Sequence, residues 1–154
     1  MPRKLIISVF LFLLFSMPAG AATVSVMVME TGLPKDGSSN QYSIMWENGV
    51  MEVLFESGHI VSNAPIMRLA KKPLNGFPDE AETDFKDAQE SGMDYFIVIV
   101  INYPSPYKVS VRLFNTKSTE MIQEKTYTDN PAQITNVRYQ GIEDAIAETS
   151  ARLR

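Results

Sequence analysis

The sequence predicts a mixed α/β fold, in which helices pack on a single mixed β-sheet in the order β-α-β-α-β-β-β-α. The first observation is a strand, helix and strand pattern that begins at Thr23, which is typical of a βαβ unit with parallel strands. The second is FIVIVI, Phe96 to Ile101, whose unbroken apolar run predicts a strand buried on both faces. The third is the alternation of apolar and polar residues in YKVSVRLFN, Tyr107 to Asn115, which indicates a half-exposed antiparallel strand.

Residues 1–22 have the composition of a secretory signal peptide, and residues 23–154 form a single domain. Arg3 and Lys4 precede an apolar run, and small residues follow it in the A-x-A pattern Ala19-Gly20-Ala21. We expect cleavage after Ala21 or Ala22. The apolar run is shorter than the roughly 20 residues that a membrane span needs, which favours a cleaved signal peptide. An uncleaved N-terminal anchor is the alternative.

Charge and cysteine content restrict the partners and the compartment. Without Arg3 and Lys4 the chain keeps 12 basic and 18 acidic residues, a net charge of −6, which disfavours nucleic acid and anionic lipid as partners. The absence of cysteine excludes lipid attachment at a lipobox and zinc held by thiolates. We therefore predict a periplasmic protein that is exported by its signal peptide, is not a lipoprotein and has no membrane span after cleavage.

The first half of the domain has clear signals for each element. Thr23 to Thr31 is apolar and β-branched, and predicts the first strand. A helix then begins at Ser38, with Gln41 completing a capping box, and ends at Gly58 in a left-handed cap. The residues expected on its apolar face are Tyr42, Met45, Trp46, Gly49, Val50, Val53 and Leu54.

The second half contains one long loop, three strands and two helices. We expect the helix at 79–91 to present a narrow apolar face, formed by Ala81, Phe85 and Ala88. After a parallel strand at His59 to Ala64, the expected elements are a loop at 65–78, a helix at 79–91, strands at 93–103, 107–115 and 120–128, and a helix at 137–153.

Two blocks of this pattern resemble a known family. They are ESGHIVSN, and GMDYFIVIVINYPSPYKVSVRLFNTKSTEMIQEKTYT, in which a small residue, an acid and an aromatic residue open the central strand. The pattern resembles the periplasmic α/β domain shared by the TolB N-terminal domain, LpoB and CsgG. The resemblance implies a non-enzymatic adaptor that binds other envelope proteins. The chain lacks the lipobox cysteine of LpoB and CsgG and the propeller of TolB, so their particular partners are not implied.

The single histidine and the single tryptophan have both structural and functional interpretations. His59 opens the second strand, and Asp94 lies at the same sheet edge if the strands that they open are parallel, so a His59–Asp94 dyad of a hydrolase is conceivable. No nucleophile motif accompanies it, and we expect His59 to be structural or solvated. We expect Trp46 to cover the sheet as a core residue, with an exposed anchor for a partner as the alternative.

The carboxyl ends of the first two strands form the candidate partner-binding surface, because open α/β sheets bind ligands at this edge. A small-ligand pocket lined by Leu33 and Met67 is the alternative use of this edge, and two loops that simply pack on each other are a third. His59 lies at the opposite end of the sheet. The residues of this loop edge are Glu30, Thr31, Gly32, Leu33, Pro34, Asn63, Pro65, Met67 and Arg68.

Other motifs exclude common cofactors. In the acidic window from Asp79 to Glu90 an EF-hand would need ligands and a glycine where Ala81, Thr83 and Asp84 stand. Gly32 stands alone, without a phosphate-binding or dinucleotide motif. We therefore predict no enzyme activity, no metal and no cofactor. The leading hypothesis is an adaptor for an envelope protein or for a second copy of itself, and a small-ligand-binding protein is the alternative.

Overall fold

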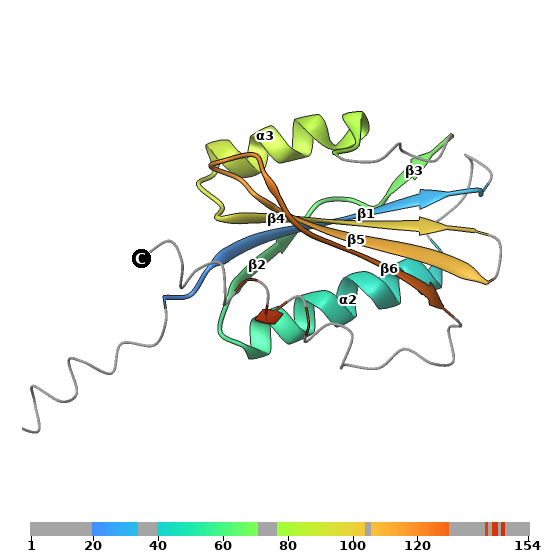
Figure 1. Ribbon diagram of the computed structural model, residues 1–154, viewed down its shortest axis with the longest axis horizontal. Helices are drawn as coiled ribbons and strands as arrows, with labels where there is room; N and C mark the ends of the chain where they lie inside the picture. The colour runs from blue at the N-terminus through green and yellow to red at the C-terminus, as the bar shows by residue number, and fades with distance from the viewer. Residues whose placement is uncertain are drawn as a thin grey trace, which may run out of the picture.

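The computed structural model of the 154-residue chain describes residues 20–33, 40–70, 77–103 and 106–129, together with residues 141, 143, 144 and 146 (Figure 1). The elements are β1 (Thr23–Thr31), α2 (Gln41–Glu56), β2 (Ile60–Asn63), β3 (Met67–Leu69), η1 (Asp79–Ala81), α3 (Glu82–Glu90), β4 (Tyr95–Asn102), β5 (Tyr107–Asn115) and β6 (Met121–Asp129).

The strands form one six-stranded mixed sheet in the order β2-β1-β4-β5-β6, with β3 also paired to β1. β1 is parallel to β2, β3 and β4, whereas β5 is antiparallel to β4 and to β6. The predicted mixed sheet, the parallel βαβ unit and the central position of the FIVIVI strand are therefore confirmed.

The two helices cover opposite faces of the sheet (Figure 1). α2 packs on the face formed by Val24, Val26 and Val28 of β1, whereas α3 packs on the face that carries Met27 and Met29. Alternate residues of a strand point to opposite faces, so β1 contributes to both cores. The predicted apolar face of α3 is confirmed, since Ala81, Phe85 and Ala88 are buried.

Both ends of α2 are capped, but its N-cap differs from the predicted one. The helix begins at Gln41, and the side chain of Asn40 accepts a hydrogen bond from the amide of Tyr42, whereas Ser38 lies outside the described residues. At the other end Gly58 has φ +87, as predicted, and the His59 amide donates to the Leu54 carbonyl. This hydrogen bond belongs to a Schellman motif, which ends the helix and directs the chain into β2.

The structure corrects two other predictions. β3 lies in the segment that was predicted to be a loop, and its three residues pair with Met29, Glu30 and Thr31 of β1. β5 was predicted to be half-exposed, yet Arg112, Phe114 and Asn115 are buried along with its apolar face. In both cases the physical reason is a contact with residues that are distant in the sequence. β1 supplies the partner strand for β3, and Phe77 and Phe85 pack against Phe114 from the α3 side.

Two predicted segments are only partly described. Residues 1–19 of the predicted signal peptide and most of the predicted helix at 137–153 lie outside the described residues, as does Pro34. Ile146, which is described, is fully buried in the core on the α2 side of the sheet. Among the described helices, none combines the length and the apolar composition needed to cross a membrane.

Trp46 fills the centre of the core between α2 and the sheet, as predicted. Its side chain is fully buried, and its ring centroid lies 5.7 Å from that of Tyr127 on β6. We predict that Trp46→Ala lowers the free energy of unfolding by about 3–5 kcal/mol, because it leaves a large cavity. Phe55→Ala is the control in the same helix, since Phe55 is 74% exposed, and its effect should stay within about 0.5 kcal/mol. Chemical denaturation measures both values, and similar losses would contradict a core role for Trp46.

Candidate functional site

The predicted loop edge separates into two regions. Glu30 and Thr31 end β1 and pair with Arg68 and Leu69 of β3. Asn63 instead pairs with Val26, halfway along β1, and Pro65 follows it. The inserted strand β3 therefore moves Asn63 and Pro65 away from the carboxyl end of β1.

A buried ion pair occupies the carboxyl end of β1. The Glu30 side chain is 1% exposed, and its Oε2 accepts hydrogen bonds from Nε and Nη2 of Arg68 at 3.0 and 2.8 Å. Its Oε1 accepts the Asn40 amide at 2.7 Å, at the start of α2. Because the Glu30 carboxylate joins β1, β3 and α2, the role of Glu30 and Arg68 is mainly to hold these elements together.

The backbone at this end is also closely packed. Thr31 Oγ1 donates to Asn102 Oδ1 at 2.8 Å. Gly32 has φ +81, and a Cβ atom there would overlap the carbonyl oxygen of Tyr103, so only glycine fits. Burial raises the pKa of Tyr103 to about 12, which keeps its phenol neutral, and the hydroxyl lies 3.0 Å from Ser43 Oγ.

Leu33 and Met67 do not line one pocket, contrary to the proposed small-ligand arrangement. Leu33 packs against the core on the α2 side, and Met67 packs against the core on the α3 side. The sheet lies between these two cores, because α2 and α3 cover opposite faces (Figure 1). Apolar character in two neighbouring loops was not enough to predict the face toward which each side chain points.

Pro65 follows β2 and lines a groove on the α3 side of the sheet, with a volume of about 250 Å³. We call it the β2–α3 groove. Asn63 also borders this groove, but its side chain points to the other face, where Nδ2 donates to Oε1 of Glu47 on α2 at 3.2 Å. No pattern in the sequence predicts this groove, although the acidic residues of the helix that forms one wall are evident there. Its lining residues are Ser25, Ser62, Asn63, Ala64, Pro65, Asp84, Asp87, Ala88, Ser91 and Met93.

β2 ends the strand order beside this groove, and its other edge is free of strand partners among the described residues. The amides of Ile60 and Ala64 donate to the carbonyls of Ala22 and Val26, so these residues face the chain of β1. Backbone groups alternate along a strand, and those of Val61 and Asn63 therefore point toward the open edge. This edge can accept a further strand.

The opposite end of the sheet holds the residues of the conceivable His59–Asp94 dyad, but they have separate partners. His59 Nδ1 accepts the Ala22 amide at 3.1 Å, and its Nε2 lies 3.2 Å from Glu143 Oε1. Asp94 instead accepts the amide and the hydroxyl of Thr23, each at 3.0 Å, and Lys117 Nζ at 3.2 Å. Among the described contacts, none joins His59 to Asp94, so the geometry does not support the dyad.

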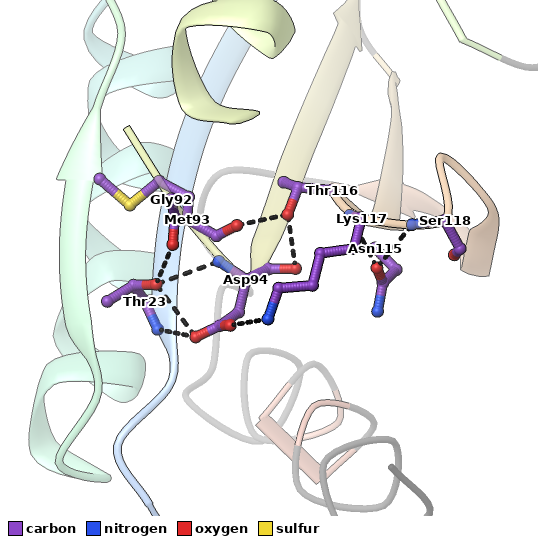
Figure 2. A network of polar contacts seen from close by, with 8 residues as sticks. All are labelled: Thr23, Gly92, Met93, Asp94, Asn115, Thr116, Lys117 and Ser118. Carbon is purple, nitrogen blue, oxygen red and sulfur yellow. Dashed lines mark hydrogen bonds and ion pairs between the residues drawn. The ribbon is translucent and has the colours of Figure 1, made fainter. Parts of the chain in front are cut away.

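Figure 2 shows that the Asp94 contacts belong to a polar network between β1, β4 and the turn after β5. Thr116 Oγ1 donates to the carbonyl of Met93 and, at 3.0 Å, to that of Asp94. Asn115 Oδ1 accepts the amides of Lys117 and Ser118 and so shapes the turn. The network joins the amino ends of β1 and β4 to the turn after β5.

No family model and no curated protein matches the sequence. TolB from Acinetobacter baumannii is a similar solved structure, with 13% identity and a TM-score of 0.49 over 82% of this chain, which spans only 27% of TolB. The C-terminal domain of LpoB from Escherichia coli has 11% identity and a TM-score of 0.44, over 72% of this chain and 84% of that domain. Lipoprotein GNA1162 from Neisseria meningitidis has 13% identity and a TM-score of 0.43, over 85% of this chain and 99% of that protein. TolB and LpoB are two of the proteins that the sequence pattern resembles, and the similarity concerns the fold.

The buried ion pair leads to a stability prediction. Arg68→Met should lower the free energy of unfolding by about 3–5 kcal/mol, because it leaves the Glu30 carboxylate buried without its guanidinium partner. Lys86→Met is the matched control, since Lys86 and Glu82 form an exposed pair 3.6 Å apart, and it should cost less than about 0.5 kcal/mol. Urea denaturation at neutral pH compares the two. Equal losses would show that the pair at Glu30 is not important for folding.

Asp94 leads to a prediction about acid stability. Burial raises the pKa of Asp94, but hydrogen bonds from Thr23 and Lys117 outweigh burial and hold it below its ordinary value of 3.8. The ionised carboxylate therefore stabilises the fold above about pH 4, and this contribution is lost as the pH falls through the lower pKa of the folded state. Asp94→Asn should reduce the dependence of the melting temperature on pH between about pH 5 and 2. Asp87→Asn, at an exposed position on α3, is the control, and an unchanged pH dependence in Asp94→Asn would contradict the assignment.

Proposed function

We propose that this protein is a non-enzymatic periplasmic adaptor that binds an extended segment of another envelope protein along the open edge of β2. The observation that carries the proposal is the β2–α3 groove, which lies directly beside that edge. An added strand would form backbone hydrogen bonds with β2, and its side chains on the α3 side would enter the groove. Strand addition of this kind obtains affinity from the main chain and specificity from pockets for alternate side chains.

The size of the groove favours side chains of a protein partner over a small-molecule ligand. Its volume of about 250 Å³ lies below the roughly 300–1,000 Å³ of typical ligand pockets. One or two long side chains fill such a space. The alternative of a small-ligand-binding protein is further weakened because Leu33 and Met67 lie on opposite faces of the sheet.

The charge of the groove favours a basic partner segment. The ten residues that line it include Asp84 and Asp87 and no lysine or arginine. α3 adds Glu82 and Glu90 to these acids, against the single base Lys86. Complementary charge increases the association rate and excludes acidic competitors, so we expect a lysine or arginine in the segment that enters the groove.

The periplasmic location is part of the proposal. The predicted signal peptide at residues 1–22 supports export. The partner is therefore sought among proteins of the cell envelope. No catalytic role is assigned, because His59 and Asp94 have separate structural partners.

Site-specific photo-cross-linking in the source cells tests the proposal. A photoreactive phenylalanine analogue replaces Ser62, which lines the groove, in the tagged full-length protein. The control places the same analogue at Thr126, which is exposed on β6 at the opposite edge of the sheet. Mass spectrometry should identify one dominant envelope protein from the Ser62 position only. Equal products from both positions, products of this chain alone, or no product would contradict the proposal.

Charge reversal then tests the chemistry of the groove. Asp84→Lys with Asp87→Lys should reduce the Ser62 cross-link at least about tenfold, because like charges at an interface cost several kcal/mol. Glu52→Lys with Glu56→Lys makes the same change in net charge at exposed positions on α2, on the opposite face of the sheet, and should leave the cross-link near its original yield. A loss in both double variants would mean that only the total charge matters.

A further inference from the structure

In the described part of the chain, burial begins at Ala22. Gly20 and Ala21 are exposed, whereas Ala22 is only 4% exposed. The carbonyl of Ala22 accepts the Ile60 amide at 2.9 Å, and its own N–H donates to His59 Nδ1 at 3.1 Å. Among the described residues, Ala22 is therefore the first that is buried and hydrogen-bonded to the rest of the fold, although the strand itself begins at Thr23.

The imidazole ring of His59, which accepts this N–H, is held in place by Glu143. His59 and Glu143 have side chains that are only 10% and 15% exposed, and His59 Nε2 lies 3.2 Å from Glu143 Oε1. Because Nδ1 accepts a hydrogen bond, the ring carries its proton on Nε2 and donates it to the carboxylate. A carboxylate on the far nitrogen makes the near nitrogen a stronger acceptor. An α-ammonium group at the Ala22 nitrogen would donate the same hydrogen bond, and its positive charge would be favourable near the Glu143 carboxylate.

We infer that signal peptidase cleaves the chain between Ala21 and Ala22, and that the new α-ammonium group of Ala22 binds His59 Nδ1 in the mature fold. Water adds across the peptide bond in this step. Its oxygen joins the carbonyl carbon of Ala21, which leaves as a carboxylate, and the nitrogen of Ala22 becomes an amine that is protonated in neutral solution. Cleavage precedes folding, because the burial of Ala22 would keep a protease from the bond.

The small-residue pattern alone allows cleavage on either side of Ala22, and the structure distinguishes the two. Cleavage after Ala22 would remove the carbonyl that pairs with Ile60 and the donor that satisfies His59. It would instead place the new charge on Thr23, whose amide donates to Asp94 Oδ2 at 3.0 Å. Cleavage after Ala21 keeps every one of these contacts and adds a positive charge beside the His59–Glu143 pair.

The mature protein itself provides the first test. The full-length gene with a C-terminal tag is expressed in a bacterium that exports it, and the protein from the periplasmic fraction is analysed by intact mass and N-terminal sequencing. We expect a chain that begins at Ala22. A chain that begins at Thr23, starts at any other residue or keeps the leader would overturn the inference.

Amine labelling of the same protein tests the role of His59. In the native protein the α-amino group should react with an acylating reagent at least about tenfold more slowly than in urea, and His59→Phe should remove most of this protection while Asp94→Asn keeps it. Circular dichroism confirms that each variant is folded. Protection that depends on Asp94 and not on His59, or an amino group that is labelled as fast in the native state as in urea, would overturn the assignment.

Discussion

β1 lies between β4 on one side and β2 with β3 on the other, and eight of its nine residues are buried. A strand in this position forms backbone hydrogen bonds on both edges and buries side chains on both faces. The positions of its neighbouring strands and helices therefore depend on it. Val24, Val26 and Val28 supply the core below α2, and Met27 and Met29 supply the core below α3. The short strands β2 and β3 exist because β1 offers them an edge.

Polar contacts close both ends of this central strand. At its carboxyl end Glu30 joins Arg68 and the start of α2, and at its amino end Thr23 joins Asp94. The buried Glu30 carboxylate would be costly without its Arg68 partner, and both sets of contacts connect elements that are distant in the sequence. These residues have the chemistry of a site, but their contacts are those of a scaffold.

The proposed binding surface lies instead at the side of the sheet, along the edge of β2 that has no strand partner among the described residues. β2 has only four residues, and the chain leaves it at Pro65, so it exposes a short edge that is flanked by the acidic α3. A short edge next to a charged helix limits uncontrolled pairing with other strands. The acidic helix surface and the free edge are independent features of the chain, and they meet only because α3 packs on the β1–β4 face.

Local patterns in the sequence determined the main elements of this protein. The bounds of β1 and β5 agree with the predicted ones, β4 occupies the apolar run, and Trp46 is in the core, because strand alternation and helical periodicity are properties of neighbouring residues. Only the tertiary structure decided which distant segments meet. It recruited Met67–Leu69 as a strand, placed Leu33 and Met67 on opposite faces and paired Asn63 with the middle of β1 instead of its carboxyl end. The reason is that a three-residue strand and a groove are stabilised by pairing and packing across the fold, and these leave no periodic signal in the sequence.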